Sequence, residues 1–464
     1  MNTGFHTISR GRMTTKPPTL QSLATALSQN AVSSAALTEA ALQRALEPSG
    51  EGSRVFTELY AAPARAAAQA SDLLRASGQL RSPIDGLPIS VKDLFDVAGS
   101  TTLAGSVALR DAAPASVSSV AVQRLLAAGA VIVGRTNMTE FAYSGLGINP
   151  HYGTPRNPWD RSTGRIPGGS SSGAAVSVSD AMAVAAIGSD TGGSVRIPAA
   201  LCGLTGFKPT ARRVSLQGVL PLSTQLDSIG PIANSVACCA TLDAILAGEP
   251  VVPLQPYSLR GLRLALPTTL VLDGMDQHVA AAFASARQRL QAAGALIEEI
   301  EIPEFAALGA INAKGGFTGA EAYAWHRALI AERAAAYDPR VISRILRGKE
   351  ISAADLIDLF AARKQWIAAV ERRIAGYDAL LLPTVPVVAP LITELEASDE
   401  AYFAANGLIL RNPSVINFLD GCALSLPCHA AGTAPVGLML AGAGGNDRKI
   451  LEIGLAVEAA LAAA

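Results

Sequence analysis

The sequence has almost no excess of either charge. Its 37 lysines and arginines are balanced by 38 aspartates and glutamates, which gives a formal net charge of −1. A balanced chain produces no long-range field that would attract a phosphate backbone or an anionic membrane surface. We therefore expect no nucleic-acid partner and no membrane partner, and we look for the function in a local site instead.

Cysteine and histidine are also scarce, with five of each in 464 residues. The odd number of cysteines, at low density and without a CxxC pair, excludes a disulfide scaffold and favours a reducing compartment. A zinc site would have few ligands to draw on. We predict no metal and no cofactor. The cysteines are Cys202, Cys238, Cys239, Cys422 and Cys428.

Long hydrophobic runs are missing as well. The first twenty residues contain no apolar stretch of signal-peptide length, so a cytoplasmic location is the default expectation. The longest apolar run of the C-terminal third, DALLLPTVPVVAPLI at 378–392, is too short to span a bilayer and is broken by three prolines. It predicts a buried strand that leads into an irregular segment.

Half of the residues are hydrophobic, which is ample for a core, and their spacing changes along the chain. Helical spacing over 18–47 predicts two helices, with Ser33 and Ser34 placed to cap the second. Helical spacing resumes over 55–77. The β-branched, alternating run 87–95 then predicts a strand that ends near Lys92. A helix over 118–130 and a buried strand over 130–134 follow, so the fold class is α/β.

The second half of the pattern is less regular. Residues 143–173 are dense in Gly, Pro, Asn and Ser, which at this length predicts a functional loop. A small-residue helix over 173–180 and a strand over 182–188 come next. We expect 250–375 to be mainly helical apart from a strand near residue 262. The last eighty residues return to strand-like runs and close with a helix over 447–463. Without repeats or charged linkers, a single domain over 1–464 is the economical interpretation.

Three places carry side chains that plain folding does not require. They are Lys92 at a strand end, Ser170–Ser172 in PGGSSSG (167–173), and Ser194 in GSDTGGS (188–194). Taken singly, a strand-end lysine is usually a solvated charge and a Gly/Ser run is usually a flexible loop. Together they offer what acyl transfer needs: a serine, a base within reach, and backbone N–H groups for the developing oxyanion.

Ser194 is the predicted nucleophile. The two glycines before it leave the backbone amides unshielded and allow a sharp turn. We therefore assign the predicted oxyanion hole to the amides of Thr191, Gly192, Gly193 and Ser194. The following VRIPAALCG predicts a short helix whose positive end faces the site.

Lysine is a better base than histidine here. None of His6, His151, His278, His326 and His429 stands in a triad signature. Lys92 acts as a base only when neutral, which requires burial to lower its pKa, and an apolar strand supplies that burial. The neighbouring Asp93 points to the opposite face of the strand, so it need not neutralise the site.

A rival nucleophile lies in the serine-rich loop. Residues 169–173 match GxSxG, the nucleophile elbow of α/β-hydrolases, which would make Ser171 the attacking residue. That elbow follows a strand directly, whereas the segment before Gly169 is a Pro-rich loop. We therefore favour Ser194, and we expect Ser171 and Ser172 to support the loop by hydrogen bonding.

The segments PGGSSSG and GSDTGGSVRIPAALCGLTGFKPT resemble the signature of the amidase signature family, serine hydrolases with a Ser-cisSer-Lys triad. The similarity extends through GLPISVKDLFDV around Lys92 and AGAVIVGRTNMTEFA at 128–142. It is strong over 80–240, moderate at both termini and weak over 250–410. The resemblance implies a large mixed β-sheet surrounded by helices, with 80–240 as the catalytic core and 250–410 as a variable helical region that shapes the substrate pocket.

The resemblance also implies a role for each reactive residue. Lys92 would be the base, and Ser194 would be acylated. Ser170 would relay protons between them after a cis peptide bond at Gly169–Ser170. On the same basis Tyr143, Ser144 and Gly169 would bind substrate. Arg196 would either reach a substrate carboxylate or, as we favour, pair with Asp190.

We expect an amidase that hydrolyses a small carboxamide to a carboxylate and ammonia or an amine. Two alternatives stay open. One is the amidase subunit of a glutamine-dependent aspartyl/glutamyl-tRNA amidotransferase, and the other is a noncatalytic binding protein on the same fold. Similar family members suggest a homodimer. The sequence does not choose among aryl, alkyl and carboxylated amides.

Overall fold

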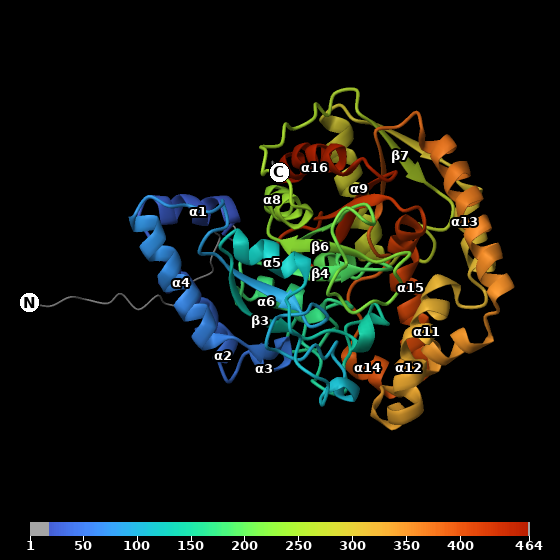
Figure 1. Cartoon of the computed structure of the whole chain (residues 1–464). Helices are drawn as coiled ribbons and strands as arrows, with labels where there is room; N and C mark the ends of the chain where they lie inside the picture. Colours follow the sequence, from blue (N-terminus) through green and yellow to red (C-terminus); the bar gives the residue numbers. More distant parts are fainter. Residues whose placement is uncertain (1–17, 463–464) are drawn as a thin grey trace, which may run out of the picture.

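A single mixed sheet organises the chain. The computed structural model describes residues 18–462, so the first seventeen residues, on which the expectation about an export signal mainly rests, and residues 463–464 lie outside it. Eleven strands form one sheet in the order β1-β3-β2-β4-β6-β5-β10-β11-β9-β7-β8. The predicted α/β class with a large mixed sheet surrounded by helices is confirmed (Figure 1).

The strands are short and mostly buried. Their bounds are β1 Phe56–Leu59, β2 Pro88–Lys92, β3 Val131–Thr136, β4 Ala185–Asp190, β5 Thr205–Lys208, β6 Ser228–Ala233, β7 Arg263–Pro267, β8 Leu296–Ile300, β9 Ala379–Pro383, β10 Cys422–Pro427 and β11 Gly437–Gly442. β2 runs parallel to both β3 and β4, whereas β4 is antiparallel to β6.

Helices and short 3-10 turns connect and cover the strands. The α-helices are α1 Leu20–Ser28, α2 Ser34–Leu46, α3 Gly52–Val55, α4 Ala61–Ala76, α5 Val120–Ala127, α6 Ser172–Ser179, α7 Arg196–Leu201, α8 Val236–Ala247, α9 Gln277–Ala292, α10 Pro303–Ile311, α11 Gly316–Arg333, α12 Pro339–Leu346, α13 Ala353–Ile374, α14 Ile392–Ala397, α15 Asp399–Phe418 and α16 Asp447–Ala462. The 3-10 turns are η1 Val107–Leu109, η2 Glu140–Ala142, η3 Ala334–Ala336 and η4 Arg347–Glu350.

Successive side chains of a strand point to opposite faces of the sheet, so the strands contribute residues to a hydrophobic core on each face. Leu264 of β7 packs into the core beneath α5, α8, α9 and α16. Its neighbour Ala265 belongs to a second core, with residues of α10, α13 and α15 such as Trp366. Figure 1 shows α8, α9 and α16 gathered at the top of the molecule and α11, α12 and α13 along its right side.

Several elements lie where the sequence predicts them. The side chain of Ser33 caps α2 by accepting a hydrogen bond from the Ala36 amide. β2 ends at Lys92, and β9 is a buried strand that leads into an irregular segment. Gly129 follows α5 with φ 86°, a conformation that suits glycine after a helix. Within residues 18–462 no helix is both long and apolar enough to cross a membrane.

Three elements differ from the expectation. The helix predicted over 55–77 is interrupted by β1 at 56–59, and the mainly helical 250–375 also contains the edge strand β8. The last eighty residues contain α15, a twenty-residue helix with Pro413 in its interior, rather than strands alone before the final helix. Tertiary packing outweighs the proline there, because α15 is held against the second core by Val415 and Ile416.

Candidate active site

Lys92 lies at the carboxyl end of β2, in the interior of the sheet. Because β2 and β4 are parallel neighbours, their carboxyl ends meet at one edge, which brings Lys92 close to the turn after β4. Lys92 is fully buried, and its Nζ donates hydrogen bonds to Ser170 Oγ at 2.7 Å and to Ser189 Oγ at 2.8 Å. The amine therefore contacts two hydroxyl groups and no bulk water.

Burial decides the charge of this amine. Desolvation lowers the pKa of Lys92 from 10.5 to about 7, against the opposing charges of Asp190 and Asp227, which favour the ammonium form. A lysine with a pKa near neutrality is substantially uncharged at physiological pH. It can then accept a proton, as general base catalysis requires.

Ser170 lies in the loop before α6, with its hydroxyl on Lys92. The peptide bond Gly169–Ser170 is cis, as the resemblance implies. The loop is fixed on both sides, since Gly169 N donates to Gly145 O at 2.7 Å and Thr139 N donates to Ser170 O at 3.1 Å. A Cβ at position 169 would approach Gly147 N to 2.5 Å, so only glycine fits there.

Ser194 lies in the turn between β4 and α7 and lines a cavity. Ser171 N donates to Ser194 O at 3.3 Å, which connects the turn after β4 to the serine-rich loop. Within residues 18–462 no hydrogen bond is formed by the Ser194 hydroxyl, which leaves it free to meet a substrate. Ser170 Oγ contacts the Lys92 amine directly.

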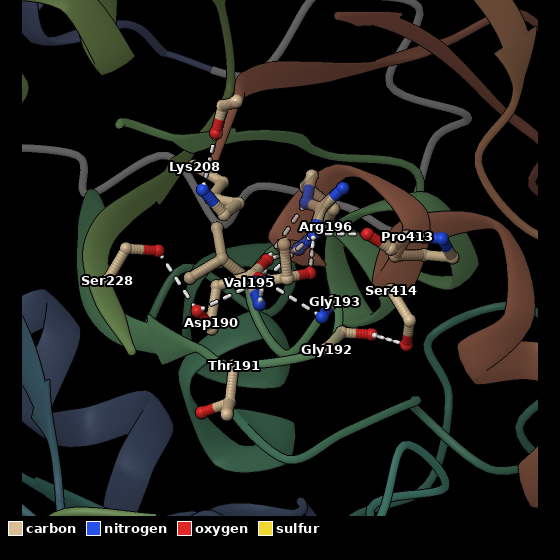
Figure 2. A network of polar contacts seen from close by, with 12 residues as sticks. Asp190, Thr191, Gly192, Gly193, Val195, Arg196, Lys208, Ser228, Pro413 and Ser414 are labelled. Carbon is tan, nitrogen blue, oxygen red and sulfur yellow. Dashed lines mark hydrogen bonds and ion pairs between the residues drawn. The ribbon is translucent and has the colours of Figure 1, made fainter. Parts of the chain in front are cut away.

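The buried carboxylate of Asp190 holds this turn (Figure 2). It accepts hydrogen bonds from Gly193 N at 2.8 Å and Val195 N at 3.2 Å, and it pairs with Arg196 through Nε at 3.0 Å and Nη2 at 2.9 Å. Asn417 Nδ2 adds another contact at 2.9 Å. Burial is the largest single influence and raises the pKa of Asp190, but the charge and hydrogen bonds of Arg196, the charge of Lys208 and the hydrogen bond from Asn417 together outweigh it and lower that pKa.

These contacts bear on the predicted oxyanion hole. The Gly193 amide already donates to Asp190, so the amides of Thr191, Gly192 and Ser194 are the ones left as candidates. The Thr191 hydroxyl donates to Asp227 Oδ1 at 2.5 Å. Burial raises the pKa of Asp227 to about 7, although that hydrogen bond lowers it.

The cavity beside Ser194 has a volume of about 380 Å³. Its walls come from the turn after β4, from the loop around residue 143, and from α10, α11, α12 and α15. Tyr143 and Ser144, which the resemblance implies as substrate contacts, lie on the cavity, whereas Gly169 does not. Besides Ser194, its lining residues are Ala142, Tyr143, Ser144, Thr191, Gly192, Leu222, Leu226, Leu270, Leu308, Gly309, Asn312, Gly315, Thr318, Arg344, Leu410, Arg411, Ser414, Asn417 and Phe418.

Arg196 is not on this cavity. Its side chain is completely buried, and Nη2 also donates to Pro413 O at 3.1 Å and to Asn417 Oδ1 at 2.6 Å. The ion pair with Asp190 is thus the arrangement adopted, rather than the contact with a substrate carboxylate. For Ser171, the segment before Gly169 is a loop rather than a strand, so the elbow context is absent.

Sequence reasoning missed several residues around the site. Ser189, the second hydroxyl on Lys92, was detectable, because it stands in GSDTGGS on a strand next to β2. Asp227 lies within LDSIGPIANS, but nothing in the sequence connects it to Thr191. The cavity residues of α12 and α15, such as Arg344 and Asn417, carry no motif and become visible only in the folded chain.

Comparison with known proteins identifies the family. Residues 36–451 match the Amidase family, and the chain belongs to it. The protein is an amidase-family hydrolase that acts on C–N bonds.

Its relatives include enzymes with different names. A 2-amino-5-chloromuconic acid deaminase of Comamonas testosteroni is 38% identical, over 86% of each chain. A subunit of the Glutamyl-tRNA(Gln) amidotransferase of Chloroflexus aggregans is 34% identical, over 94% of this chain and 95% of that one. Among solved structures, a crystal structure of an amidase is 34% identical and covers 95% of this chain and 99% of that chain, with a TM-score of 0.86.

Proposed function

We propose that this protein hydrolyses a small carboxamide to a carboxylate and ammonia or an amine through an acyl-enzyme on Ser194. Lys92 is the base, and Ser170 relays the proton. The amides of Thr191, Gly192 and Ser194 hold the oxyanion of the tetrahedral intermediate. The deaminase relative is named for the removal of an amino group, which favours ammonia as the leaving group here.

The reaction has two halves that balance. Ser194 Oγ attacks the carbonyl carbon, its proton passes to Ser170, and the Ser170 proton passes to neutral Lys92. When the C–N bond breaks, the proton returns through Ser170 to the leaving nitrogen. Water then attacks the ester and gives one proton to Lys92 along the same path. That proton returns to Ser194 Oγ as its bond to the acyl carbon breaks, and the carboxylic acid that leaves gives its remaining proton to the released amine or to solvent.

One observation carries the proposal. The Lys92 amine lies in contact with Ser170 Oγ at 2.7 Å, buried at the base of the turn whose Ser194 lines the cavity. A solvated ammonium could not serve as the base, because it would be protonated at neutral pH. The buried amine can.

The test is ammonia release from a panel of small primary amides. Ser194→Ala is expected to lower kcat by about 10⁴-fold or more, since the nucleophile is lost. Lys92→Ala is expected to lower it by about 10²- to 10⁴-fold, the usual contribution of a general base. The exposed Ser77 and Lys364 supply matched controls, and their alanine variants should keep wild-type rates. Near wild-type turnover in either site variant would overturn the assignment.

A second candidate is supported by the amidotransferase relatives. Several proteins about as long as this chain are named as a subunit of Glutamyl-tRNA(Gln) amidotransferase. In that case the protein would release ammonia from glutamine only with a tRNA-binding partner. Co-purification of such a partner, or glutamine hydrolysis that depends on it, would favour this alternative over the free-standing amidase.

The organisation of the chain is part of the proposal. We propose a single domain in which 80–240 carries the chemistry and 250–410 shapes the substrate pocket, which is supported by Leu308, Asn312 and Thr318 on the cavity wall. A homodimer and a cytoplasmic location are also proposed. Light scattering of the purified protein and fractionation of the producing cells test these two points.

A further inference from the structure

We infer that Asp227 is a positioning residue that holds the Thr191 end of the turn after β4, whose amides are proposed to bind the oxyanion. The inference rests on the proposed function and adds to it a residue that is not itself on the cavity. It begins from the sheet. β4 and β6 are antiparallel, and their ladder ends where Asp190 pairs with Ser228. Thr191 and Asp227 therefore face each other immediately beyond the last pair.

Side chains continue the ladder by one step. The Thr191 hydroxyl donates to Asp227 Oδ1 at 2.5 Å. Asp227 Oδ2 accepts hydrogen bonds from the amides of Leu222 at 3.0 Å and Ser223 at 3.1 Å. One carboxyl group therefore joins the turn after β4 to the segment that places Leu222 and Leu226 on the cavity wall.

The same segment is also fixed to α11. Glu321 of α11 accepts a hydrogen bond from the Ser223 hydroxyl, another from the Thr224 hydroxyl at 2.6 Å, and a third from Gln225 N at 3.4 Å. Asp227 thus belongs to a segment that is itself held in place, as a group that positions another residue requires.

The Thr191 hydroxyl is the atom through which this end of the turn is held. Within residues 18–462 the Thr191 side chain forms no hydrogen bond other than that to Asp227, and Figure 2 shows it directed away from the Asp190–Arg196 pair. The other residues of the turn have partners of their own. These contacts are Gly193 N to Asp190 Oδ1 at 2.8 Å, Ser414 Oγ to Gly192 O at 3.3 Å and Ser171 N to Ser194 O at 3.3 Å.

Asp227 is an unfavourable residue on other grounds. It is only 5% exposed, its three donors are uncharged, and within residues 18–462 no lysine or arginine pairs with it. Burial of a carboxylate without a cation costs free energy. Its charge also raises the pKa of Lys92 and so opposes the neutral form of the proposed base. The bond to Thr191 gives this buried carboxyl group a use.

A positioning role predicts a particular kinetic effect. In the tetrahedral intermediate a negative charge develops on the former carbonyl oxygen, and backbone amides stabilise it when they already point toward it. The substrate carbonyl carries less charge, so it gains less from the same amides. A turn that is no longer held by Asp227 should therefore lower kcat and leave KM almost unchanged.

The experiment first removes the bond from the Thr191 side. Thr191→Val deletes the hydroxyl and keeps the β-branched shape. On a small primary amide it should lower kcat by about 10- to 100-fold, less than the usual loss of an oxyanion donor itself. Thr191→Ser keeps the hydroxyl and should restore most of the rate. Thr102→Val is the matched control and should keep wild-type rates, because Thr102 Oγ1 donates to Asp96 Oδ1 at 2.6 Å outside the cavity.

Asp227→Asn tests the other partner. Rates are compared well above pH 7, where Lys92 is neutral in every variant. Asp227→Asn should also lower kcat, and the double variant with Thr191→Val should be little slower than the slower single variant, since both changes break one bond. Losses that multiply in the double variant, or a wild-type kcat in Thr191→Val, would overturn the inference. Unfolding midpoints of all variants identify any general loss of structure.

Binding of butylboronic acid separates this inference from the proposed chemistry. Ser194 Oγ adds to boron, its proton passes to the base, and the tetrahedral anion that forms occupies the oxyanion hole. Calorimetry should show binding to the wild-type protein, none to Ser194→Ala, and about tenfold or more weaker binding to Thr191→Val. Ser194-dependent binding of equal strength in wild type and Thr191→Val would retain the proposed function and reject the positioning role. Wild-type binding that is absent, or that does not depend on Ser194, would reject both.

Discussion

At the scale of single residues, the proposed site depends on a lysine whose pKa is lowered by burial to about 7. Lys92 is enclosed at the end of β2, with the carboxylates of Asp190 and Asp227 close enough to influence it. Desolvation outweighs both charges. An amine with a pKa near 7 can accept a proton without a neighbouring histidine, and in the proposed mechanism its protonation state sets the rate.

We expect kcat/KM to rise with pH through an apparent pKa of about 7. The pKa of Lys92 is lowered from 10.5 to about 7, so the amine is protonated and inactive below that pH and neutral above it. The apparent pKa of this rise in kcat/KM should lie far below 10.5, the ordinary pKa of a lysine. A pH–rate profile of the wild-type protein on one small amide measures it.

Asp227 offers the control, because its pKa is also about 7. The negative charge of Asp227 raises the pKa of Lys92. In Asp227→Asn, kcat/KM should therefore still rise with pH, but with a lower apparent pKa than in the wild-type protein. Disappearance of this rise in Asp227→Asn would show that the carboxyl group, not the amine, controls the rate.

Residue by residue, the sequence indicates the reactive groups because each stands in a local motif. Lys92, Ser170 and Ser194 carry their signals within a few neighbours, and the roles assigned to them stay predictions. Asp227 and Arg344 carry none, since their meaning comes from chain segments far apart in sequence. The sequence predicts the Gly193 amide as part of the oxyanion hole. In the structure this amide donates a hydrogen bond to the side chain of Asp190, and the sequence does not show in which direction that side chain points.

At the scale of elements, the position of α12 controls the cavity wall that holds Arg344. Gly348 follows α12 in η4 and packs on α11, and a Cβ at this position would meet Gly319 O at 2.0 Å and Tyr323 Cβ at 2.7 Å. The carbonyl belongs to the backbone of α11 and cannot rotate away. η4 and α11 can therefore approach this closely only because residue 348 has no side chain.

Gly348→Ala is expected to destabilise the protein by about 1–3 kcal/mol, the usual effect of overpacking. It should also raise KM, because Thr318 of α11 and Arg344 of α12 lie on the same cavity. Gly407→Ala in α15 is the matched control, since nothing lies within 4 Å of a Cβ there. That variant should gain about 0.5–1 kcal/mol from better helix propensity. Chemical denaturation and steady-state kinetics measure both, and equal stability changes in the two variants would contradict the packing argument.

The sequence pattern does not predict β1, β8 and α15, because each of them lacks the regular spacing of apolar residues or the helix propensity on which such a prediction depends. β1 is only four residues long, and β8, with the sequence LIEEI, is an edge strand in which Leu296 and the two glutamates are exposed. Neither has enough alternating burial to outweigh helical spacing around it. α15 contains Asn406, Gly407 and Pro413, which are poor helix formers, and it is stable because the second core and the Asp190 network hold it.

At the scale of the whole molecule, the sheet joins segments that the sequence separates. β9 lies between β11 and β7, and β10 pairs with β5, so strands from both sides of 250–410 and from within it share one ladder. The weakly matching region is therefore part of the same sheet rather than an appended unit. The sequence indicates this only by its lack of linkers.

We expect one cooperative unfolding transition as a result, because neither part can lose its strands without exposing a strand edge in the other. Tryptophan fluorescence tests this directly. Trp159 reports from the loop of the proposed catalytic core, whereas Trp325 of α11 and Trp366 of α13 report from the region over 250–410. Denaturation of Trp159→Phe and of the double variant Trp325→Phe/Trp366→Phe should each coincide with the circular-dichroism transition of the same protein. Fluorescence and circular-dichroism midpoints that differ within either variant would instead show that the chain contains independently unfolding units. The region over 250–410, which forms part of the pocket wall, would then unfold separately from the proposed catalytic core.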